Sequence, residues 1–155
     1  MTPEQKIKAA EEQRIHLLDE LLGKEIAGIY GFFAVKENED AYCFYIGRAT
    51  NMVGRLFGCD GGHLHLFLKE DYEKLVPQKI KNYLDLGYDI EIRLLDNFED
   101  TYRDTDFSKA AHRLALAEYQ QIVKYQELGQ CLDQFPDGMG AKEKNYWESR
   151  YKEES

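Results

Sequence analysis

The stretch GIYGFFAVKENEDAYCFYIG, which runs from Gly28 to Gly47, decides how this chain is expected to fold. Its first eight residues, 28–35, are rich in aromatic and branched side chains and predict a strand. Residues 36–40 form a polar turn, and residues 41–46 return to strand-forming side chains. Two such runs joined by a short polar segment predict an antiparallel hairpin.

Helical patterns follow the hairpin in four segments: residues 49–57, 64–75, 78–86 and 108–128. The first has Thr50 or Asn51 as its expected cap. Gly87 and Gly129 are expected to end the third and fourth, because glycine readily adopts the backbone conformation that closes a helix. Between these two helices, residues 89–95 alternate apolar and polar side chains, which predicts a third strand.

A further helix is expected at the N-terminus. Thr2 can cap it, and Pro3 is tolerated in its first turn. Apolar residues then recur at helical spacing as far as Gly23, a plausible stop: Ile7, Ala10, Leu17, Leu18, Leu21 and Leu22. The expected order of elements implies an α/β fold: a small three-stranded antiparallel sheet flanked by helices, with an extra N-terminal helix.

Composition and charge restrict the classes of function. A hydrophobic content of 43% among 155 residues is ordinary for one globular domain. No apolar run has the length of a membrane helix, and residues 1–8 lack a signal-peptide pattern, so we expect a cytoplasmic protein with no membrane partner. The three cysteines form no C-x-x-C pair and are expected to be reduced. The net charge of -9 counts against nucleic-acid binding, although a cationic cleft can lie on an acidic surface.

Two tripeptides in the hairpin carry a more specific signal. Gly28-Ile29-Tyr30 lies on the first strand, and Tyr45-Ile46-Gly47 ends the second. In this order on paired strands they resemble the signature of the GIY-YIG nucleases. The resemblance covers about residues 24–140, which would be the catalytic domain. Residues 1–23, the N-terminal helix, and residues 141–155, a charged tail with interleaved aromatic side chains, lie outside it.

The resemblance implies roles for individual residues. Family members have an arginine eight residues after the second triplet's glycine, here Arg55, and a glutamate on a later helix, for which Glu118 is the best candidate. Some also have a basic residue directly after the triplet, here Arg48. The implied activity is phosphodiester hydrolysis in DNA, or secondarily in RNA, by a one-metal mechanism.

These roles are chemically sensible. Tyr30 would act as the base that activates water, Tyr45 would position water or phosphate, and Arg55 would bind phosphate oxygens through its planar fork. Glu118 would hold Mg²⁺ or Mn²⁺, which prefer oxygen ligands. Arg48 would contact a substrate phosphate. The plainer interpretations stay open: strand tyrosines often only pack, and Arg55 and Arg48 can be surface charges.

The chain also departs from the family pattern. Cys59 stands where many members have a histidine; His63 can substitute, as a phosphate contact, if the glycine-rich loop folds back. The asparagine that often follows the catalytic helix is missing; Asp133 in this region can supply an oxygen ligand or cap a turn, and Gln130 lies nearby. These departures and the acidic charge leave an alternative open, a catalytically weak or inactive fold of this type that binds protein. A nuclease this small would need a homodimer, a partner protein or a specific loop contact to recruit its substrate.

Overall fold

The computed structural model describes residues 1–18 and 26–152. It is an α/β fold built on one four-stranded mixed sheet with strand order β1-β4-β2-β3. The strands are β1 (Ile15–Leu17), β2 (Gly28–Val35), β3 (Tyr42–Ala49) and β4 (Asp89–Asn97). β2 pairs antiparallel with both β3 and β4, so the predicted hairpin and third strand are confirmed.

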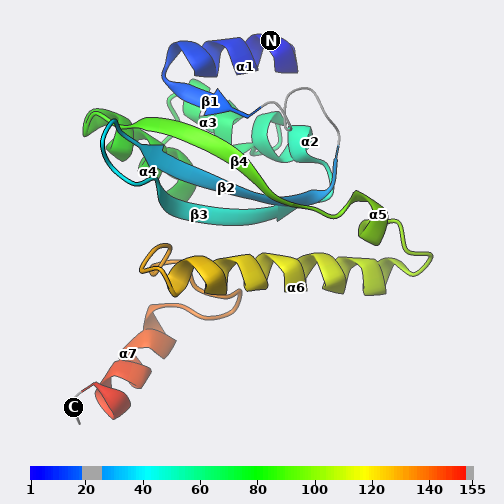
Figure 1. Cartoon of the computed structure of the whole chain (residues 1–155), viewed down its shortest axis with the longest axis vertical. Helices are drawn as coiled ribbons and strands as arrows, with labels where there is room; N and C mark the ends of the chain where they lie inside the picture. Colours follow the sequence, from blue (N-terminus) through cyan, green and yellow to red (C-terminus); the bar gives the residue numbers. More distant parts are fainter. Residues whose placement is uncertain (19–25, 153–155) are drawn as a thin grey trace.

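Helices cover both faces of the sheet (Figure 1). On one face lie α1 (Pro3–Glu12), α2 (Met52–Phe57), α3 (His63–Leu68) and α4 (Leu75–Asp85); on the other lies α6 (Phe107–Gln126), preceded by the short α5 (Glu99–Tyr102). α7 (Ala141–Tyr151) projects away from this layered body. No helix in the described part of the chain is long and apolar enough to cross a membrane.

The central strand β2 explains this layering. Its residues from Gly28 to Ala34 are all buried. Tyr30, Phe32 and Ala34 join the core beneath α1–α4, whereas Ile29 and Phe33 join the core above α6. A strand buried on both faces reads as a nearly continuous apolar run, which is what the opening stretch of sequence shows.

The prediction of three strands and a helix reaching Gly23 was wrong in both respects. α1 ends at Glu12, and Arg14 has a positive φ of 66°. A right-handed helix cannot continue through a residue in this conformation. Residues 15–17 instead form β1, which pairs parallel with β4 and makes the sheet four-stranded and mixed. Leu21 and Leu22, counted toward the predicted helix, lie outside the described residues.

The other helix predictions needed smaller corrections. The helix predicted over residues 64–75 is α3, which ends at Leu68 because Glu70 turns back with a φ of 60°. Asn51 caps α2 by accepting a hydrogen bond from the Gly54 amide. The residues of the charged tail that the structure describes include α7, a helix that its charge pattern did not indicate.

α1 helps to position α2, which carries one of the predicted site residues. Lys6 on α1 is buried, and its Nζ donates a 2.7 Å hydrogen bond to the Phe57 carbonyl at the end of α2. A buried ammonium needs such partners to offset its lost hydration. This bond therefore ties the N-terminal helix to the helix that follows the hairpin.

Candidate functional site

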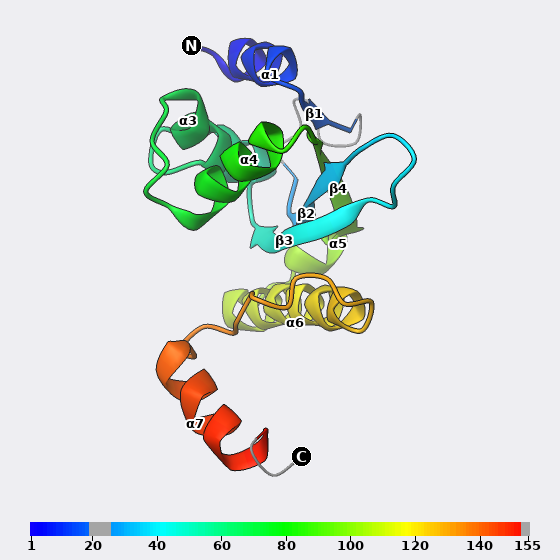
Figure 2. The ribbon, with the colours of Figure 1, turned by 90° about the vertical axis from the view of Figure 1, so that its left-hand side faces the viewer.

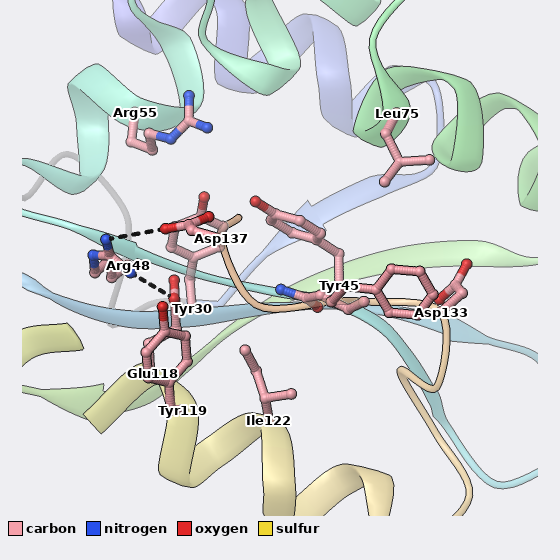
Figure 3. A pocket seen from close by; sticks show the side chains of 12 residues that line it. Tyr30, Tyr45, Arg48, Arg55, Leu75, Glu118, Tyr119, Ile122, Asp133 and Asp137 are labelled. Atoms are coloured by element: carbon pink, nitrogen blue, oxygen red, sulfur yellow. Dashed lines mark hydrogen bonds and ion pairs between the residues drawn. The ribbon is translucent and has the colours of Figure 1, made fainter. Parts of the chain in front are cut away.

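A pocket of about 510 Å³ lies beside β3, the strand at one edge of the sheet. β2, β3, α2, α4, α6 and the segment after α6 all contribute to its wall. Five residues predicted from the sequence line it together: Tyr30, Tyr45, Arg48, Arg55 and Glu118. Figure 3 shows Arg55 reaching in from α2, opposite Glu118, Tyr119 and Ile122, which rise from α6. Residues far apart in the sequence thus converge on one surface hollow.

Tyr30 forms the inner wall of this pocket. Its residue surface is 0% exposed, and its hydroxyl lies 3.0 Å from Nε2 of His63. Gly47 faces it across the hairpin, and a Cβ at that position would come within 2.4 Å of the Tyr30 hydroxyl oxygen. The glycine that ends the second triplet therefore leaves the space that the tyrosine ring occupies.

Burial governs the ionisation of Tyr30. It raises the tyrosine's pKa well above the ordinary value of about 10, and the nearby Tyr45 acts in the same direction, whereas Arg55 only partly offsets the shift. The hydroxyl is therefore protonated at neutral pH in the protein alone. A phenolate, the form in which a tyrosine is a strong base, is therefore not the resting form of Tyr30.

His63 lies behind Tyr30 in the protein interior. It is the first residue of α3, is 6% exposed, and does not line the pocket directly. Burial, helped by the positive charge of Arg55, lowers the pKa of His63 to about 3. In the neutral tautomer whose Nε2 carries no proton, that nitrogen accepts a hydrogen bond from the Tyr30 hydroxyl. The glycine-rich loop thus brings His63 to the site, next to the tyrosine.

Tyr45 and Arg55 border the open side of the pocket. Tyr45 is half-buried, with its ring centroid 5.5 Å from that of His63 and 6.3 Å from that of Tyr30. Burial raises the pKa of Tyr45, and Arg55 acts against this rise. Arg55 is exposed and has no ion pair with any carboxylate in the described part of the chain. Its guanidinium is therefore available to an anion.

Glu118 and Arg48 form an ion pair at the wall of the pocket. Arg48 Nη1 lies 2.7 Å from Glu118 Oε1, and Arg48 Nη2 lies 3.7 Å from Asp137 Oδ2 (Figure 3). Burial raises the pKa of Glu118, and Arg48 lowers it in part. Glu118 is thus a nearly buried carboxylate, with 12% of its side chain exposed, that lines the pocket beside Arg48.

The carboxylate of Glu118 is the donor that suits a divalent cation here. Among the described residues there is no group of three or more histidine, cysteine, aspartate or glutamate side chains that could hold a metal. Mg²⁺, however, commonly binds proteins through one or two carboxylates and keeps several waters. A single buried carboxylate at the wall of this pocket fits that mode of binding, and Asp137, which also contacts Arg48, is a second carboxylate on the wall.

The segment that follows α6 completes the pocket with residues that no spacing rule indicated. Gln134, Phe135 and Asp137 line the wall, as does Asp133. Asp133 forms an ion pair with Lys79 at 2.5 Å. The bonds of Gln134 to the Ile46 backbone hold this segment on β3. Only the tertiary fold reveals these contacts.

Comparisons of the chain with protein-family models, with curated proteins and with solved structures gave no match.

Proposed function

We propose that this pocket binds the phosphodiester backbone of a nucleic acid, DNA in the first place, and hydrolyses it with the aid of a bound Mg²⁺ or Mn²⁺. The observation that carries the proposal is the convergence of Tyr30, Tyr45, Arg55 and Glu118 on one pocket. Both tyrosines come from the two hairpin triplets, and these triplets carry the resemblance to GIY-YIG nucleases. The arginine and the carboxylate come from two separate helices.

Arg55 would bind the phosphate that is cleaved. Its guanidinium carries a permanent charge, faces no carboxylate partner in the described residues, and offers paired donors to two oxygens. Charge develops on these oxygens as water attacks phosphorus, so an arginine fixed beside them stabilises the transition state more than the ground state. Arg48, held by Glu118 on the same wall, would contact a neighbouring phosphate.

Tyr30 and His63 would together remove the proton from the attacking water. The Tyr30 oxygen accepts the proton from water while the Tyr30 hydroxyl proton moves to Nε2 of His63, 3.0 Å away. Such a transfer needs no preformed phenolate, which the burial of Tyr30 disfavours. The relay leaves a hydroxide aimed at phosphorus and a protonated imidazole. As the hydroxide bonds to phosphorus, the P–O bond to the leaving oxygen breaks, and that oxygen takes up a proton from solvent. The imidazolium, a strong acid because the pKa of His63 is about 3, releases its proton to solvent through Tyr30.

Glu118 would hold the divalent cation through its carboxylate. When bound, the cation would neutralise charge on a phosphate oxygen and lower the pKa of a coordinated water. Arg48 keeps the carboxylate ionised and directed to the pocket wall, despite the burial that raises its pKa. Tyr45, at the open side, would orient the phosphate through its hydroxyl.

The acidic surface limits how substrate reaches this pocket. With 20 basic and 29 acidic residues, the chain offers little long-range attraction to phosphate. A second copy of the chain or a partner protein would therefore bring the nucleic acid to the site.

A cleavage assay tests the proposal. A labelled duplex and a labelled single strand are incubated with the protein in Mg²⁺, in Mn²⁺ and in Ca²⁺. We expect cleavage with the first two cations, and Glu118→Gln should lower the rate by at least about 100-fold while the circular dichroism spectrum is retained. The matched control is Glu127→Gln, at the exposed end of α6. Equal rates for wild type and Glu118→Gln would refute the assignment.

A specific observation also favours the second candidate, a protein-binding module. α7 buries none of its residues, and Tyr146, Trp147 and Tyr151 are 65%, 51% and 59% exposed. A helix of 11 residues is marginal on its own in water, so a partner would stabilise it by covering these rings. Sedimentation of the wild type and of Trp147→Ala tests whether the chain associates with itself through this face. If α7 binds a second copy, the wild type should associate and Trp147→Ala should not.

A further inference from the structure

Two buried thiols meet where the segment after α6 docks on the sheet. The sulfur of Cys131 lies 3.4 Å from that of Cys43 and 3.2 Å from the Cys43 carbonyl oxygen, although 88 residues separate the two cysteines. Both residues are 0% exposed. The sulfurs of a disulfide are about 2.05 Å apart, so a bond between these two requires an approach of roughly 1.4 Å.

Residues 130–137, here called the strap, are held to β3 by side-chain amides. Gln130 accepts a 2.7 Å hydrogen bond from the Cys43 amide. Gln134 accepts one from the Ile46 amide at 2.9 Å and donates one to the Ile46 carbonyl. In Figure 2 the segment joining α6 to α7 runs between α6 and β3. Isolated side-chain bonds open more readily than a continuous strand ladder, so brief opening of the strap would expose both thiols.

We propose that Cys43 and Cys131 form an intramolecular disulfide under oxidising thiol conditions, and that this bond locks the strap on β3. The strap brings Gln134, Phe135 and Asp137 to the pocket wall, so the lock would fix the shape of that wall. The inference depends on the paired thiols and on the strap, and it stands whether or not the pocket is a nuclease site.

Oxidised glutathione is a suitable oxidant, and the exchange balances. The Cys131 thiolate, which moves with the strap, attacks one glutathione sulfur, breaks the glutathione disulfide and releases the first glutathione thiolate. The Cys43 thiolate then attacks the Cys131 sulfur of the mixed disulfide and releases the second. The two protons lost by the cysteines go to the two glutathione thiolates, so the protein is oxidised and glutathione reduced.

The test uses the full chain with Cys59→Ser, because Cys59 is exposed and would form adducts of its own. The folded variant is equilibrated at increasing ratios of oxidised to reduced glutathione. We expect a mass loss of two hydrogen atoms, the disappearance of both thiols, and a cross-linked peptide pair containing Cys43 and Cys131. Hydrogen exchange at the Ile46 amide should slow, and the Tm should rise by about 5 to 15 °C.

Two matched controls are Cys59→Ser combined with Cys43→Ser or with Cys131→Ser, each of which retains one buried thiol and can form only a mixed disulfide. Circular dichroism establishes that each variant is folded. The disulfide assignment is overturned if folded Cys59→Ser keeps both thiols at every ratio, or if they link only after denaturant is added. A disulfide that forms without slower exchange at Ile46 would overturn the lock.

Discussion

The Tyr30 hydroxyl and His63 Nε2 share a 3.0 Å hydrogen bond between residues 33 apart in the sequence. The bond joins the middle of the sheet to the first residue of α3 and lies directly behind the candidate pocket. It gives a buried tyrosine, whose pKa is raised, a neutral acceptor for its proton.

His63→Gln should therefore lower kcat by about 100-fold or more and leave KM nearly unchanged, because His63 acts through Tyr30 and does not line the pocket. His65→Gln, two residues along the same short helix, is the matched control and should cleave at the wild-type rate. Steady-state cleavage kinetics provide the measurement. Full activity in His63→Gln would show that the proton of Tyr30 goes elsewhere.

His63 should also make the protein sensitive to acid. Its pKa is lowered to about 3 in the folded state, whereas an unfolded histidine has a pKa of about 6.5. Below about pH 6.5 the unfolded chain thus binds a proton that the folded chain does not. The contribution of His63 to stability is therefore complete above that pH and is lost as the pH falls toward 3.

Urea unfolding at several pH values measures this effect. Between about pH 6 and pH 4, His63 alone should reduce the free energy of unfolding by up to about 1.4 kcal/mol per pH unit. His63→Gln should remove that part of the slope, although it is expected to be less stable than the wild type at pH 7. Parallel curves for the two proteins would mean that His63 is protonated in the folded state as readily as in the unfolded chain.

Gly47→Ala should displace the Tyr30 ring, because the new Cβ would lie 2.4 Å from its hydroxyl oxygen. We expect a loss of about 1 to 3 kcal/mol in the free energy of unfolding, together with a large loss of cleavage. Gly54→Ala is the matched control. Gly54 lies in α2, and a Cβ at this position would lie 3.6 Å from the nearest neighbouring atom, which is an ordinary contact. Alanine also favours a helix more than glycine does. That variant should be at least as stable as the wild type, and equal stability of Gly47→Ala and Gly54→Ala would contradict the packing argument.

Binding of DNA should be weak and strongly dependent on salt. A fluorescence titration in Ca²⁺, which suppresses cleavage, gives the dependence of log Kd on log salt concentration. Arg55→Gln should weaken binding and reduce that slope by about one, because one phosphate contact is lost. Arg103→Gln, which removes an exposed arginine paired with Glu99, should leave the slope unchanged. Tight binding that persists at high salt would refute the inference drawn from net charge.

The sequence predicted the centre of this fold better than its periphery. The bounds of β2 were predicted correctly, because a doubly buried strand has a continuous apolar pattern. β1 was missed, because three residues carry no usable period and Ile15 and Leu17 also suit a helix. Only pairing with β4 decides their conformation.

In the site, too, some residues could be predicted from the sequence and others could not. The paired triplets led to both tyrosines. Spacing from the second triplet led to Arg55, and the expected glutamate on a later helix led to Glu118. All four line the pocket. Gln134 and Asp137 could not be predicted, since their positions depend on how the strap folds back onto β3 and Arg48. The burial of Tyr30, which changes its expected ionisation, likewise arises from packing that the sequence does not display.

A crystal structure of the protein grown or soaked with Mn²⁺, recorded near the manganese absorption edge, tests the central claim most directly. We predict an anomalous peak at the Glu118 carboxylate, within the pocket that Tyr30 and Arg55 line, and no such peak in Glu118→Gln crystals treated in the same way. An empty pocket with the Arg48–Glu118 ion pair intact at saturating Mn²⁺, or a peak bound elsewhere and unaffected by Glu118→Gln, would contradict the proposed metal-dependent nuclease site.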